Sequence, residues 1–119
     1  MSNWLSPAQL ERLAILQEEM CEAGQIIQKI VRHGYESYDP TIEGDFTTNR
    51  QLLEKELGHV LSALDRLDAA DEVIFITMDV HAKNKAFSAQ PYLHHQPDDF
   101  MSRTFSLTEQ SQGEPCSTL

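Results

Sequence analysis

The longest uninterrupted helical stretch of this chain limits its possible folds more than any other feature. From Pro7 to about His33 the sequence holds strong helix formers and no further proline, and Gly34 is a natural stop. Ser6 and Gln9 form an S-x-x-Q capping box at its start. About 27 residues at 1.5 Å each make a rod of roughly 40 Å. That rod is long for a chain of 119 residues.

A second helical stretch follows a segment rich in turn formers. Residues 34–48 include Asp-Pro and Gly-Asp pairs and show neither helical nor strand periodicity, so they are predicted to form a loop. Thr48 and Gln51 give a second capping signal. From Leu52 to about Ala70 the apolar residues keep helical spacing. The sequence therefore predicts a second long helix, antiparallel to the first.

Residues 72–87 allow two interpretations. Four β-branched residues within 73–78 could form a strand. No second strand-like run exists to pair with it, so we predict a shorter third helix from about Glu72 to Phe87, which Asp71 could cap. From Gln96 on, polar residues with proline and glycine predict a disordered tail. We thus expect an all-α chain with one helical domain over 1–95 and a tail over 96–119.

Charge and cysteine content exclude several classes of protein. The net charge of −10 argues against a non-specific binder of nucleic acid or of anionic membranes. Cys21 and Cys116 lie far apart and outside any Cys/His zinc spacing, so we expect neither a disulfide framework nor a structural zinc site. The sequence shows no signal peptide and no stretch of roughly 20 apolar residues. We therefore expect a soluble, cytoplasmic protein.

Two stripes of the predicted long helices carry carboxylates between apolar residues. One stripe has spacings of four, three and four and consists of Ile15, Glu19, Glu22 and Ile26. The second helix repeats this arrangement with Leu52, Glu56, His59 and Ala63. If the helices pack on these stripes, their carboxylates repel one another, and a divalent cation would relieve the repulsion. Mg²⁺ completes its coordination with waters and phosphates, which implies a phosphorylated substrate.

A simpler interpretation of these stripes remains open. Acidic residues at such spacing ordinarily form the solvated face of a bundle helix, and Glu18, Glu19 and Glu22 fit that description. A single imidazole such as that of His59 commonly finds a backbone or carboxylate partner and does nothing more.

Two half-motifs on these helices suggest a family. Glu18-Glu19-Met20-Cys21-Glu22 matches an EExxE pattern, and Glu56-Leu57-Gly58-His59 lies where an ExxD pattern would follow. Together with the sequence around them, from about Leu10 to Leu67, they resemble the MazG-like nucleotide pyrophosphohydrolases.

The resemblance implies an all-α helical bundle, in which two long antiparallel helices and a shorter third are completed by a second subunit, as a homodimer or a dimer of dimers. Its members cleave nucleoside triphosphates between the α and β phosphates with Mg²⁺ or Mn²⁺, giving a monophosphate and pyrophosphate. By position, Glu19, Glu22 and Glu56 would be metal ligands. Glu18 would bind a further ion or act as the base for the attacking water.

His59 departs from the family pattern, which has an aspartate there. Imidazole is a poor ligand for Mg²⁺ and a good one for Mn²⁺, Co²⁺, Ni²⁺ or Zn²⁺. Three outcomes are open: His59 is a fourth ligand in a site for a softer metal, three carboxylates bind the metal beside His59, or the site no longer turns over. The third outcome would make the chain a non-catalytic helical interaction protein on a MazG-like scaffold.

Substrate contacts are predicted at two further places. Lys29 and Arg32, near the end of the first helix, and Lys83 and Asn84, on the third, could bind phosphate. A charge pair at a helix C-terminus and ordinary surface residues are equally consistent with them. Trp4, Tyr35 and Tyr38 could stack on a nucleobase, although aromatic residues beside loops more often close the end of a core.

Overall fold

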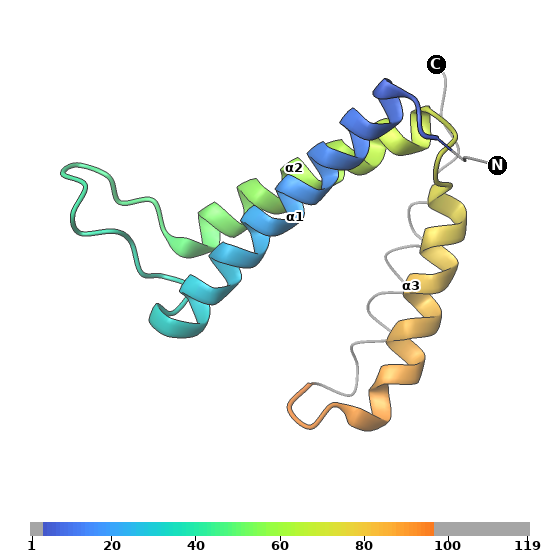
Figure 1. Ribbon diagram of the computed structural model, residues 1–119. Helices are drawn as coiled ribbons and strands as arrows, with labels where there is room; N and C mark the ends of the chain where they lie inside the picture. The colour runs from blue at the N-terminus through green and yellow to red at the C-terminus, as the bar shows by residue number, and fades with distance from the viewer. Residues whose placement is uncertain (1–3, 97–119) are drawn as a thin grey trace, which may run out of the picture. The chain divides into compact units, whose positions relative to one another are not determined.

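The computed structural model describes residues 4–96 and is helical throughout its regular structure (Figure 1). The elements are α1 (Pro7–His33), α2 (Asn49–Ala69), α3 (Phe75–Ala89) and a short 3₁₀-helix, η1 (Gln90–Tyr92). No strand occurs between residues 4 and 96, so the predicted all-α class is confirmed over this range. The predicted tail lies outside the described residues, except for Gln96.

Both long helices begin at the predicted capping boxes. Ser6 Oγ accepts a hydrogen bond from the Gln9 amide at 3.1 Å, and the Ser6 amide donates to Gln9 Oε1 at 2.8 Å. Thr48 and Gln51 make the same reciprocal pair at 3.2 and 2.9 Å. Each box satisfies two amides that the first helical turn leaves without partners. The boundaries of α1, 27 residues long, are those expected from the sequence.

The third helix begins later than predicted. It starts at Phe75 rather than about Glu72 and ends at Ala89, and the alternative strand over 73–78 does not form. The expectation that Asp71 caps this helix is wrong, because Asp71 has a φ of 57° and its amide donates to the Asp68 carbonyl at 3.0 Å. A left-handed residue interrupts a right-handed helical path, so Asp71 belongs to the turn that ends α2. Among the described helices, none is both long and apolar enough to cross a membrane.

The chain consists of two compact units, the first ending at Ile74 and the second beginning at Phe75. In the first unit, α1 and α2 pack against each other as an antiparallel hairpin, as Figure 1 shows. The seam between them buries Ala23, Ala63 and Leu67. Because two of these are alanines, the two backbones can approach closely.

Polar contacts fasten the hairpin at both ends. At the loop end, the buried Asn49 donates from Nδ2 to the Gly34 carbonyl at 3.0 Å. At the open end, the Arg12 guanidinium pairs with the carboxylate of Glu72, just after α2. Removing either contact would leave a partly buried polar group without its partner, so both set the register of the two helices.

The predicted loop over residues 34–48 is built from local hydrogen bonds. Asp39 Oδ1 accepts from the amide and hydroxyl of Thr41 at 2.9 and 2.6 Å, and Asp45 makes the same pair with Thr47 at the same two distances. These bonds favour the charged carboxylate, so the pKa values of Asp39 and Asp45 are lowered, chiefly by the threonine hydroxyls.

Arg50, in the first turn of α2, holds the start of the loop. Its amide donates to the Tyr35 carbonyl at 2.8 Å, and its Nε lies 2.6 Å from Glu36 Oε1. Its guanidinium also stacks over the Tyr35 ring, 4.6 Å from the ring centre. These contacts hold the first residues of the loop against the first turn of α2.

Candidate metal centre

Four side chains that can bind a metal converge at the middle of the hairpin. They are Glu19 and Glu22 from α1 and Glu56 and His59 from α2, and one ligand atom from each lies within 4.8 Å of the others. We call them the carboxylate cluster. The structure thus brings the two half-motifs together, which the sequence alone could only suggest.

The helical spacing explains why these four side chains meet. Glu19 and Glu22 are separated by three residues, as are Glu56 and His59, so each pair lies on one face of its helix. The buried Ala23 follows Glu22 directly on α1, and Ala63 follows His59 by four residues on α2. Small residues in this part of the seam let the two pairs approach.

The imidazole of His59 connects the two helices. Its Nδ1 lies 3.2 Å from Glu56 Oε2 and 3.2 Å from Glu19 Oε2. The contact with Glu56 has hydrogen-bond geometry. Glu19 Oε2 is buried, and no described residue donates a well-directed hydrogen bond to it. The cluster therefore holds one acceptor atom that the side chains around it do not fully satisfy.

The carboxylates interact strongly with one another. The pKa of Glu22 is raised, first because its side chain shares a hydrogen bond with Glu56, and then by the charges of Glu56, Glu19 and Glu18 together with partial burial. Glu56 itself is only 8 % exposed. Nearby negative charges disfavour the ionised form of a carboxyl group, so the cluster favours the entry of a positive charge.

This donor set fits a divalent cation. Three carboxylates from two helices supply hard oxygen ligands, and the imidazole adds a nitrogen that borderline metals accept. A dication would offset the repulsion among the carboxylates and give the buried Glu19 oxygen a partner. The nearest lysine is a weak substitute, since Lys55 Nζ lies 3.9 Å from Glu56 Oε1 and its side chain is 60 % exposed.

The other predicted site residues lie outside the cluster. Glu18 is exposed beside it and contributes to it through its charge, as one cause of the raised Glu22 pKa. Lys29 lies two helical turns beyond Glu22 and lines a cavity described below. Arg32 is exposed and does not line that cavity.

Lys83 and Asn84 belong to the second unit of the chain. Lys83 Nζ lies 3.0 Å from Asp79 Oδ2, one turn earlier on α3, and Asn84 is exposed. Their predicted contact with phosphate therefore remains a prediction.

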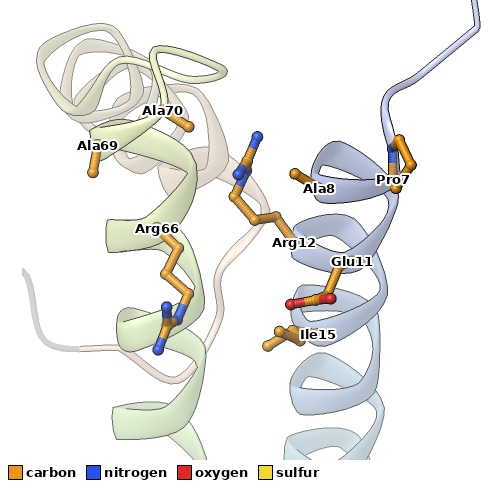
Figure 2. A pocket seen from close by; sticks show the side chains of 8 residues that line it. All are labelled: Pro7, Ala8, Glu11, Arg12, Ile15, Arg66, Ala69 and Ala70. Atoms are coloured by element: carbon orange, nitrogen blue, oxygen red, sulfur yellow. The ribbon is translucent and has the colours of Figure 1, made fainter.

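A cavity of about 530 Å³ lies at the open end of the hairpin (Figure 2). It is lined by Arg12 and Ile15 of α1 and by Arg66 of α2, among others. In Figure 2 the Arg66 side chain extends toward the level of Ile15, whereas Arg12 points the other way along the hairpin. We call this space the arginine cavity.

A second cavity of about 840 Å³ lies beneath the loop at the other end of the hairpin. Helix α1 contributes Lys29 and His33, α2 contributes Asn49, Leu52 and Lys55, and the loop supplies the rest. We call it the loop cavity.

The sequence analysis predicted neither cavity, although a signal for both was present. Arg12 precedes Glu19 by seven residues and Lys29 follows Glu22 by seven, and a spacing of two helical turns keeps side chains on one face. Repeating this step in both directions from the half-motifs would have identified residues that line the two cavities.

Comparison with known proteins identifies no relative of this chain. No family model matches the chain, and searches of curated proteins and of solved structures find no significant match.

Proposed function

We propose that this chain is a metal-dependent nucleoside triphosphate pyrophosphohydrolase of the MazG-like kind, which cleaves the bond between the α and β phosphates. One observation carries the proposal: Glu19, Glu22, Glu56 and His59 come from two helices and place their ligand atoms within 4.8 Å of one another. These are the positions at which the sequence resembles the two half-motifs of that family.

The electrostatics of the cluster favour a bound cation over a structural role. A structural ion-pair network balances its charges, but this one collects three carboxylates around one imidazole and raises the pKa of Glu22. Such a cluster opposes folding at neutral pH unless a positive charge enters it. A ligand site explains why these residues occupy the middle of the seam.

The residues around the cluster can perform hydrolysis in a simple scheme. A bound dication supplies charge neutralisation for the substrate phosphates. Glu18, exposed next to Glu19, accepts a proton from the attacking water. The water oxygen bonds to the α-phosphorus, the bond from that phosphorus to the bridging oxygen breaks, and pyrophosphate leaves. The products are a nucleoside monophosphate and pyrophosphate.

The metal that fits depends on His59. Three carboxylates alone suit Mg²⁺, whereas a fourth ligand of imidazole nitrogen favours Mn²⁺ or a softer ion. Because His59 Nδ1 is 3.2 Å from two of the carboxylates, His59 is close enough to be that ligand. We therefore propose Mn²⁺ as the better activator, with Mg²⁺ as the alternative.

We also propose that the hairpin pairs with a second copy, as a homodimer or a dimer of dimers, in a helical bundle. Large apolar side chains on both long helices remain exposed, including Val31 at 73 % and Leu61 at 61 %. Exposed apolar side chains that gather on a surface favour pairing with another protein. The cytoplasm is the proposed compartment, and the charge of −10 favours neither nucleic acid nor anionic membranes as partners.

One observation favours a second candidate function. His59 Nδ1 lies 3.2 Å from both Glu19 Oε2 and Glu56 Oε2, so the imidazole itself can bridge the two carboxylates where a metal would otherwise bind. In that case the chain would be a MazG-like interaction protein without catalytic activity.

Pyrophosphate release separates the two candidates. The protein would be incubated with a panel of ribo- and deoxyribonucleoside triphosphates and Mg²⁺, Mn²⁺ or Co²⁺, with Glu56→Gln as the matched inactive control. We expect metal-dependent release of equal amounts of monophosphate and pyrophosphate. No product from any triphosphate with any of the three metals would reject the enzymatic proposal and favour the interaction protein.

A further inference from the structure

We propose that the loop cavity holds the nucleoside part of the substrate, so that the base lies beneath the α1–α2 loop while the phosphates lie at the carboxylate cluster. This inference rests on the proposed function and extends it, because it assigns the base and ribose to a named site and gives the bound substrate a direction along the hairpin.

The register of the helices supports this placement. Lys29 follows Glu22 by seven residues, and Asn49 precedes Glu56 by seven, so the cavity continues the same seam toward the loop. Seven helical residues span about 10 Å, a distance comparable to the length of a nucleoside. An α-phosphate at the cluster would therefore leave its ribose and base within the cavity.

Lys55 lies where the cavity and the cluster meet. It lines the cavity, and its Nζ is 3.9 Å from Glu56 Oε1 in the cluster. Lys29 lines the same cavity from the opposite helix. The Lys55 cation at this junction suits the α-phosphate, which is the group that joins a nucleoside to the reacting bond.

The lining has the mixed character of a small-molecule site. Ile42, Leu52 and the ring of Tyr38 supply apolar surface, and the volume of about 840 Å³ lies within the usual range for ligand pockets. The Tyr38 ring is held edge-on by Phe46, with the ring centres 5.3 Å apart and the planes at 71°. A ring held in this way can stack on a nucleobase with little loss of side-chain entropy.

Polar groups for hydrogen bonding are fixed in place beside this surface. The carboxylates of Asp39 and Asp45 line the cavity, and each is held by two hydrogen bonds from a threonine two residues later. Both have lowered pKa values and are charged at neutral pH. Such acceptors suit ribose hydroxyls or the amino and imino groups of a base, and they disfavour phosphate at this end.

The arginine cavity is a poorer site for the nucleoside. It is smaller, at about 530 Å³, and none of the residues that line it is aromatic. Arg66 contributes a guanidinium group to it, whereas the guanidinium group of Arg12 pairs with the carboxylate of Glu72. The loop cavity is therefore the better of the two places for the nucleoside, with the phosphates at the carboxylate cluster.

The test titrates the full chain with AMP, GMP, CMP and UMP in separate experiments and follows the amide signals by NMR. Mg²⁺ is the metal in these samples, because it is diamagnetic and Mn²⁺ would broaden the signals. We expect at least one probe to shift amides within residues 37–49, and to leave those of Ala69 and Ala70 unchanged. Tyr38→Ala, which removes the ring, and Ile42→Trp, which fills the cavity, should each weaken that binding by about tenfold. Ala69→Trp in the arginine cavity is the matched control and should not.

The other possible results either overturn this placement of the nucleoside or separate it from the proposed function. Shifts confined to the arginine cavity, no shifts with any probe, or unchanged affinity in both loop-cavity variants would overturn the placement. A fall in Mg²⁺ affinity in Tyr38→Ala or Ile42→Trp, measured without nucleotide, would show that the variants damage the cluster and would also count against it. If a monophosphate binds beneath the loop but no triphosphate is hydrolysed, the proposed function fails while the nucleoside site stands.

Discussion

Nδ1 of His59 on α2 lies 3.2 Å from Oε2 of Glu19 on α1. This contact joins the two half-motifs across the hairpin, and it places a nitrogen ligand where the family pattern has an aspartate. Whether the imidazole binds a metal there or only bridges the two carboxylates separates the two candidate functions, so the predictions concentrate on this group of residues.

Removing one carboxylate charge from the cluster should abolish activity without lowering the stability of the metal-free protein. Glu22→Gln and Glu56→Gln should each abolish hydrolysis, because an amide is a much weaker ligand for a hard dication. The metal-free variants should unfold at the same temperature as the wild type or a higher one, since the substitution relieves repulsion at Glu22. Thermal unfolding with EDTA and with Mn²⁺ measures both effects.

Glu54→Gln serves as the control for this pair, because Glu54 is exposed on α2 two residues before Glu56 and lies outside the cluster. It should leave activity and the Mn²⁺-induced rise in melting temperature unchanged. A large loss of metal-free stability in Glu22→Gln would indicate a structural ion-pair network instead of a metal site.

The metal-free protein should lose stability as the pH rises above mildly acidic values. The raised pKa of Glu22 means that the folded state binds this proton more tightly than the unfolded state. Its contribution to the free energy of unfolding is complete below the ordinary pKa of 4.5 and is lost as the pH rises through the raised value. Urea unfolding in EDTA at several pH values tests this, and Glu22→Gln should reduce the slope. Equal slopes in both proteins would contradict it.

The loop should respond to pH in the opposite direction. The lowered pKa values of Asp39 and Asp45 contribute stability that is present above the ordinary value of 3.8 and is lost as the pH falls through the lowered values. Asp45→Asn should therefore weaken the acid dependence of the loop amides of residues 41–47 in NMR spectra. If the variant and the wild type lose these signals over the same pH range, the Asp45 hydrogen bonds do not stabilise the loop.

His59→Asp should shift the metal preference toward Mg²⁺. A fourth carboxylate adds a hard oxygen ligand and more repulsion, so the metal-free protein should become less stable and Mg²⁺ should restore it more than in the wild type. The measurement is the rise in melting temperature with Mg²⁺ and with Mn²⁺. His81→Asp makes the same substitution at an exposed position of α3 and should change neither preference. An unchanged ratio in His59→Asp would show that His59 is not near the metal.

The chain should self-associate through its exposed apolar side chains. Leu61 is 61 % exposed on α2, and covering it with a second copy would remove apolar area from water. We expect the wild type to sediment as a dimer or larger species at micromolar concentration, and Leu61→Lys to shift it toward monomer. Gln25→Lys, at an exposed polar position of α1, is the control for added charge. A stable wild-type monomer would reject the proposed assembly.

The sequence by itself determined the two long helices and their starts. Ser6 with Gln9, and Thr48 with Gln51, specify their helix starts through local hydrogen bonds, so no information from distant residues was needed. The same reasoning failed at Asp71, where a residue type that favours caps adopts a left-handed turn conformation instead. Asparagine and aspartate tolerate both conformations, and nothing in the local sequence separates them.

Only the tertiary structure decided which faces of the helices meet. Periodicity placed Glu19 with Glu22 and Glu56 with His59, but a solvated stripe and a packed one have the same spacing in sequence. Packing around Ala23 and Ala63 brings the pairs together, leaves Glu18 outside, and forms the cavities at the two ends of the hairpin. Spacing within a helix is a local property, whereas the distance between two helices depends on side chains far apart in the chain, and for that reason the site required the fold.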